Sequence, residues 1–120
     1  MDVIGESIHV ISARVRTALE ERDKKTLQDL AMRQVKNGAH MLDLNIGPQK
    51  REGHEIMPWL VDVVQEVVDV PFSLDTTNVA AIEAGLKRCR RPAIINSTDA
   101  TEGRMSTMMP LAARYDAGLI

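Results

Sequence analysis

The chain has 120 residues, of which 44% are hydrophobic and 27% are charged, and its formal net charge is -2 at pH 7. These values describe an ordinary globular sequence with one modest core and at most one domain. They exclude the strongly basic surface typical of nucleic-acid binding, since the one basic cluster, residues 87–91, suits a solvated helix end. No apolar run approaches the roughly 18 residues of a membrane span.

Two features bear on the cellular compartment. Cys89 is the one cysteine in the sequence, so no internal disulfide can form. The N-terminus lacks a signal-peptide pattern. Together these features predict a protein of the reducing cytoplasm. Because Cys89 lies between two arginines at an expected helix end, a structural role is favoured over nucleophilic catalysis.

Strand and helix patterns alternate from the N-terminus. Residues 3–5 are a brief apolar stretch that predicts a first strand, and Ser12 is a candidate cap for a short helix. Asp23 then begins a longer helix with apolar residues at helical spacing, and Gly38 ends it. Residues 40–45 predict a second strand, which a polar loop follows.

The middle of the chain repeats this alternation. Residues 55–69 place apolar side chains on one helical face, with Pro58 in the tolerated first turn. Residues 70–74 predict a buried third strand that ends in Asp75. The polar residues 76–78 supply N-cap candidates for the helix that follows.

The last third continues the pattern. Residues 92–96 predict a fourth strand, and residues 102–116 predict a fourth helix that Pro110 should kink or split. Residues 118–120 begin a further apolar segment. The joint before it, residues 116–118, resembles the joint at residues 37–39, so both should lead from a helix into a strand.

This order of elements limits the fold. Alternating strand–helix units predict an α/β protein with a parallel sheet, either doubly wound or a (β/α)8 barrel. A barrel usually needs about 250 residues. We therefore expect residues 1–120 to form a partial domain, the first half of a (β/α)8 TIM barrel, with four βα units and the start of strand five.

Polar residues stand at the carboxyl ends of successive expected strands: Glu6, Asp43, Asn45, Asp75 and Asn96. Any one of them alone suits a turn, but in a barrel such residues converge on one mouth. None is a cation, so the pocket suits a neutral, donor-rich heterocycle better than a phosphate. A 2-amino-4-oxo pyrimidine ring offers the donors and acceptors that carboxylate and amide groups recognise. A metal site of His9, Asp43 and Asp75 has no spacing signature and is disfavoured.

Four segments carry a resemblance to a known family: residues 4–6 (IGE), 41–48 (MLDLNIGP), 73–86 (SLDTTNVAAIEAGL) and 95–98 (INST). They resemble the pterin-binding methyltransferases, that is, the methyltetrahydrofolate:corrinoid-protein methyltransferases of acetogenic one-carbon metabolism and anaerobic O-demethylation. The likeness runs through nearly the whole chain. It implies a barrel related to dihydropteroate synthase, with a folate bound at its mouth.

The resemblance implies a site and a reaction. Family members contact the pterin through an aspartate and an asparagine that match Asp75 and Asn96, and Asp43 and Asn45 would line the same pocket. The implied reaction moves a methyl group between N5 of methyltetrahydrofolate, the substrate, and the cobalt of a corrinoid carried by a partner protein. The resemblance assigns no proton donor within this chain, so the catalytic residue stays unknown.

The sequence also departs from the family. Many relatives read Gly-Glu-Arg-hydrophobic-Asn after the first strand, whereas residues 5–9 here read GESIH. His9 is a candidate replacement for a polar contact, although a structural histidine is favoured slightly. The family takes further pterin contacts from a second half of the barrel.

Three alternatives stay open at this stage. A dihydropteroate synthase-like enzyme is the nearest rival, but residues 9–12 (HVIS) lack the Asn-Val-Thr-Pro-Asp-Ser-Phe-like loop of that family. The others are a non-catalytic pterin-binding half-barrel and a truncated half-barrel without activity. The exposed edges of the first and fourth expected strands predict that two copies pair as a homodimer.

Overall fold

The computed structural model describes residues 4–5, 13–46, 52–76, 78–96, 110–115 and 117–119. Its strands are β1 (Ile4–Gly5), β2 (Met41–Asn45), β3 (Phe72–Asp75), β4 (Ile94–Asn96) and β5 (Gly118–Leu119). Its helices are α1 (Ala13–Glu21), α2 (Lys24–Lys36), α3 (Gly53–Gln65) and α4 (Val79–Leu86). Residues 110–114 are also helical. The chain is therefore an α/β protein, as its strand and helix patterns predicted.

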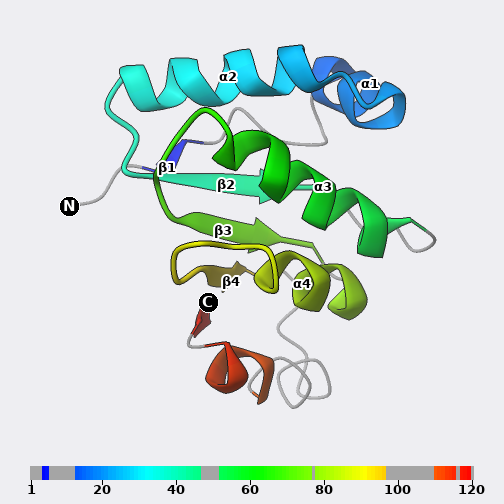
Figure 1. Cartoon of the computed structure of the whole chain (residues 1–120), viewed down its shortest axis with the longest axis vertical. Helices are drawn as coiled ribbons and strands as arrows, with labels where there is room; N and C mark the ends of the chain where they lie inside the picture. Colours follow the sequence, from blue (N-terminus) through cyan, green and yellow to red (C-terminus); the bar gives the residue numbers. More distant parts are fainter. Residues whose placement is uncertain are drawn as a thin grey trace.

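The strands form one parallel sheet in the order β1-β2-β3-β4-β5, so that each strand pairs with the next along the chain (Figure 1). A doubly wound sheet reverses its strand order at a switch point. The described strands contain no such reversal. This successive order is compatible with part of a TIM-barrel-like fold.

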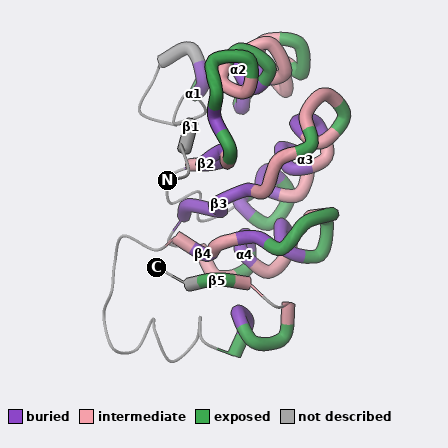
Figure 2. The backbone as a smooth tube through the Cα atoms, turned by 90° about the vertical axis from the view of Figure 1, so that its left-hand side faces the viewer, coloured by how far each residue is buried: buried purple, intermediate pink, exposed green. Residues whose placement is uncertain are grey.

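Helices α3 and α4 lie on the same side of β2, β3 and β4, as Figure 2 shows. The side of the sheet that faces them is apolar. Leu44, Leu74 and Ile95 occupy paired positions on three adjacent strands, and each is fully buried. They pack with fully buried residues of the helices, among them Leu60 and Ile82. Burial of this kind stabilises the fold by about 1.5–3 kcal/mol per large side chain.

Two side chains predicted to cap helices do so, whereas Ser12, the cap candidate for α1, lies outside the described residues. The Asp23 carboxylate accepts a hydrogen bond of 3.2 Å from the Thr26 amide at the start of α2. Asn78 accepts one of 3.1 Å from the Ala81 amide at the start of α4. Gly38 follows α2 with φ of 100°, a left-handed conformation in which glycine avoids the usual Cβ clash.

The two predicted helix-to-strand joints have the same hydrogen bond. The Ala39 amide donates to the Gln34 carbonyl at 3.0 Å, and the Ala117 amide donates to the Ala112 carbonyl at 2.8 Å. Each bond spans five residues and closes the end of a helix before the chain enters a strand. The likeness expected from the sequence is therefore confirmed.

Several boundaries differ from the prediction. Helix α3 begins earlier and ends earlier than residues 55–69, so Pro58 lies inside the helix and cannot donate to the His54 carbonyl. After Gln65, Glu66 and Val67 form a turn, and residues 68–71 are neither helix nor strand. The predicted fourth helix is described only from Pro110 onward, so its earlier part lies outside the described residues.

To cross a membrane, a helix needs about 20 predominantly apolar residues. Across the described ranges, no helix has both the length and the apolar character to do so.

Candidate functional site

The side of the sheet that faces away from the helices carries the polar residues. A Cβ built on Gly85 of α4 would lie 3.0 Å from Leu74 Cδ1, so the Leu74 side chain points at the helix. Successive residues of a strand point to opposite faces. Ser73 and Asp75, on either side of Leu74, therefore face away from α4.

The carboxyl ends of three strands bring together three predicted site residues, which we term the upper row: Asn45, Asp75 and Asn96. Asn45 pairs with Asp75 across β2 and β3, and Asp75 pairs with Asn96 across β3 and β4. Asp75 is buried, whereas both asparagines are half-buried. The Asn45 side-chain amide donates a 3.2 Å hydrogen bond to Asp75 Oδ2. Carboxylate and amide groups thus lie in one row across the carboxyl ends of β2, β3 and β4.

A second polar pair, the lower row, lies one step further along the same face. Asp43 and Ser73 pair across β2 and β3, two residues before Asn45 and Asp75 respectively. Asp43 is 6% exposed and Ser73 is 1% exposed. Among the described residues, Asp43 Oδ1 and Ser73 Oγ have no hydrogen-bond partner. Asp43 was predicted from the sequence, but Ser73 was not, although its two-residue spacing from Asp75 placed both on one face.

Two residues from the first expected strand and its loop cannot be placed. Glu6 and His9 lie outside the described residues. Their predicted contributions to the pocket stay predictions. Within the described part of the chain, no three His, Cys, Asp or Glu side chains gather as potential metal ligands.

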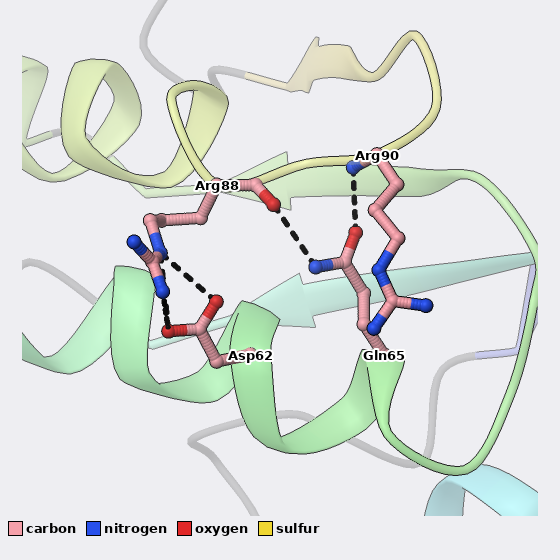
Figure 3. Close-up of polar contacts among 4 residues, drawn as sticks. All are labelled: Asp62, Gln65, Arg88 and Arg90. Atoms are coloured by element: carbon pink, nitrogen blue, oxygen red, sulfur yellow. Dashed lines mark hydrogen bonds and ion pairs between the residues drawn. The ribbon is translucent and has the colours of Figure 1, made fainter.

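The basic cluster of residues 87–91 follows α4 and precedes β4, at the opposite end of that strand from Asn96. Figure 3 shows two of its members, Arg88 and Arg90, with Asp62 and Gln65. Arg88 forms hydrogen bonds of 2.7–3.1 Å with the Asp62 carboxylate of α3. The Gln65 side chain donates to the Arg88 carbonyl and accepts from the Arg90 amide. Hydrogen bonds from Arg91, together with its positive charge, lower the pKa of the Asp69 carboxyl. These contacts join the end of α3 to the segment after α4.

Comparison with known proteins adds the family. The family described as "Pterin binding enzyme" matches residues 12–120 of this chain. The chain belongs to the pterin-binding enzyme family. This assignment agrees with the resemblance seen in the strand-end motifs, three of which lie within the matched range.

The relatives that the comparison found include a methylcorrinoid:tetrahydrofolate methyltransferase and two methionine synthases. The chain is 30% identical over 111 residues to a methylcorrinoid:tetrahydrofolate methyltransferase of Eubacterium limosum, an alignment that covers 92% of this chain and 41% of that protein. It is 31% identical over 124 residues to the methionine synthases of Mycobacterium leprae and Mycobacterium tuberculosis. Those two alignments cover 98% of this chain and 10% of each synthase. The chain thus spans less than half the length of each of these relatives.

Proposed function

We propose that this chain binds methyltetrahydrofolate at the carboxyl ends of its strands and takes part in methyl transfer between N5 of the folate and the cobalt of a corrinoid protein. The observation that carries the proposal is the upper row, in which Asn45 and Asp75 are hydrogen-bonded and Asn96 occupies the next paired position. Family membership supports pterin binding in general. The partner is proposed because the Eubacterium limosum relative is named for a methylcorrinoid and tetrahydrofolate.

The upper row suits a pterin ring chemically. The Asp75 carboxylate accepts hydrogen bonds, whereas the amides of Asn45 and Asn96 can both donate and accept. A ring with N–H, amino and carbonyl groups on its edge requires both kinds of partner. The Asn45 amide also orients the Asp75 carboxylate by donating to one of its oxygens. A positioned group of this kind reduces the ordering that ligand binding requires.

Methyl transfer from N5 places a further demand on the site. A tertiary amine is a poor leaving group until N5 is protonated or strongly hydrogen-bonded. The negative charge of Asp75 favours positive charge that develops on the nearby ring. Within this proposal, Asp75 and Asn96 hold the ring, while Asp43 and Glu6 line the pocket. A methyltransferase is favoured over a dihydropteroate synthase-like enzyme because the relatives named above act in methyl transfer or methionine synthesis.

We further propose that two copies of the chain associate. The outer strands of the described sheet are β1 and β5, and each pairs with one neighbour only. The fourth strand, expected at an edge, is an inner strand because β4 pairs with both β3 and β5. The free edge of a parallel strand presents unpaired N–H and C=O groups to another chain. Pairing of two copies would add strands to each edge. A cytoplasmic location is proposed with it, because the single cysteine suits a reducing compartment.

The direct test is a calorimetric titration of the 120-residue chain with methyltetrahydrofolate. We expect binding in the micromolar range that Asp75→Asn weakens by at least about tenfold, or about 1.4 kcal/mol. The substitution keeps the shape of the side chain but removes its charge and one acceptor.

Asp69→Asn is the matched control, since Asp69 is an exposed aspartate in the segment that precedes β3, at the opposite end of that strand from Asp75. It should leave the affinity unchanged. Absence of binding to the unmodified chain, or equal weakening by both substitutions, would contradict the proposed site. Binding without transfer of the methyl group to a free corrinoid would instead favour a non-catalytic pterin-binding module.

A further inference from the structure

The lower row presents two buried polar atoms that the fold itself does not satisfy. Among the described residues, Asp43 Oδ1 and Ser73 Oγ have no hydrogen-bond partner, although both residues are more than nine-tenths buried. A buried polar group left unpaired costs about 1–3 kcal/mol. Such groups in a folded protein call for an explanation. A bound molecule that hydrogen-bonds to both atoms would explain why two of them lie side by side.

The position of the lower row connects it to the proposed site. Ser73 and Asp75 point to the same face of β3, and Asp43 and Asn45 do so on β2. Two residues along a strand span about 6.6 Å. A flat ring that contacts Asp75 at the carboxyl end of β3 can therefore reach Ser73 if one side of the ring extends along the strand.

The chemistry of the pair selects the group that it would receive. An ionised carboxylate only accepts hydrogen bonds, whereas a serine hydroxyl donates or accepts. A nitrogen with attached hydrogens, placed between Asp43 and Ser73, can donate to both oxygens. Tetrahydropterin rings carry N–H and amino groups of this kind on their edges.

We propose that Ser73 is a ligand-binding residue which, with Asp43, accepts hydrogen bonds from an N–H or amino group on the ring of the bound pterin. This inference rests on the proposed function, because it takes the ligand to be a pterin. It adds a contact below the strand-end positions and makes Ser73 part of the site.

The inference predicts effects of opposite sign on stability and on affinity. Ser73→Ala removes a buried hydroxyl that has no hydrogen-bond partner among the described residues, so the melting temperature should stay the same or rise. The same substitution removes a hydrogen bond from the complex, so the dissociation constant for methyltetrahydrofolate should rise about three- to tenfold. A serine with a purely structural role would show the reverse.

The experiment combines thermal melting without ligand with calorimetric titration. Two ligands are compared: methyltetrahydrofolate, and a reduced pterin without the aminobenzoyl-glutamate tail. Thr26→Val is the matched control, because the Thr26 hydroxyl donates a 2.7 Å hydrogen bond to Asp23 and lies in helix α2, outside both rows of strand residues. It should lower the melting temperature and leave both affinities unchanged.

The outcomes separate this inference from the function on which it rests. Weaker binding of both ligands by Ser73→Ala, at an unchanged or higher melting temperature, supports the inference. If the unmodified chain binds but Ser73→Ala binds equally well, or if its melting temperature falls, the inference fails and the proposed function stands. An effect confined to the ligand with the tail also overturns it, since the contact would then not be to the ring. If the unmodified chain binds neither ligand, the proposed function fails and the inference fails with it.

Discussion

Cys89 shows how local burial decides the chemistry of one side chain. Burial, together with the nearby Asp62 carboxylate, raises the pKa of the Cys89 thiol from its usual 9.0 to about 12. Thiolates, not thiols, act as nucleophiles. A thiol that stays protonated across the physiological range is inert. The structure therefore agrees with the structural role expected for this residue.

We predict that Cys89 reacts slowly in the folded chain. At pH 8, labelling by iodoacetamide should be much slower for the native protein than for the protein in denaturant, because the folded thiol stays protonated and partly covered. Mass spectrometry of timed samples would measure both rates. Equal rates in the two states would show that the thiol is exposed and easily ionised.

The same shift predicts how folding stability depends on pH. The unfolded thiol loses its proton near pH 9.0, whereas the folded thiol keeps it until about pH 12. Stability should therefore fall as the pH rises from about 9 toward 12, with no contribution from Cys89 below that window. Melting temperatures of the unmodified chain and of Cys89→Ala, each measured at pH 8 and pH 10, would isolate the contribution of Cys89 to this pH dependence.

Other single residues were accessible from the sequence to different degrees. Asp75 and Asn96 were predicted because each ends an apolar run, and Asp23 and Asn78 because their side chains suit helix caps. Ser73 was not singled out, since a serine inside an apolar strand gives no chemical signal by itself. Its missing partner becomes visible only when the neighbouring strand and the covering residues are in place.

At the scale of elements, the close contact between α3, α4 and β3 depends on Gly85. A Cβ at this position would lie 2.7 Å from Met57 Cγ and 3.0 Å from Leu74 Cδ1. The first distance is shorter than real Cβ contacts, so the residues around it would have to shift. Gly85 thus allows α4 to approach α3 and the sheet.

We predict that Gly85→Ala destabilises the chain although alanine favours a helix by about 1 kcal/mol. Overpacking of a close-packed interior costs about 1–3 kcal/mol, which outweighs or cancels that gain. Urea denaturation would measure the change. Ala80→Gly, at an exposed position of the same helix, is the control for helix propensity. A clear gain in stability from Gly85→Ala would show that the contact relaxes easily.

Element boundaries show which sequence signals are local. The caps of α2 and α4 and the two helix-to-strand joints were predictable, because each involves residues within five positions of one another. The extent of α3 was not. Helix α3 begins at Gly53, earlier than the periodicity of its apolar residues indicates. Gly53 lies close to Asn78 and Ala81, which follow it by more than twenty residues in the sequence.

At the scale of the whole molecule, the sheet leaves β1 and β5 at its two described edges. We predict that the 13.3 kDa chain sediments as a dimer of twice that mass at micromolar concentration, because each edge offers unpaired backbone groups to a second copy. Sedimentation velocity over a dilution series would measure the proportion. Methyltetrahydrofolate should increase it if two copies together complete the site. A monomer at every concentration, with and without ligand, would contradict the prediction.

By itself, the sequence determined the alternation of strands and helices, most of the helix caps and the polar residues that end the strands. These properties depend on side-chain chemistry and on periodicity over short stretches of chain. Only the tertiary structure decided between a doubly wound and a successive strand order and paired Asn45 with Asp75. It also left Asp43 Oδ1 and Ser73 Oγ buried with no hydrogen-bond partner among the described residues. Those features arise from contacts between residues 21–37 positions apart in the chain, because neighbouring strands are separated by at least one helix. No local pattern specifies such a contact until the strands are in register.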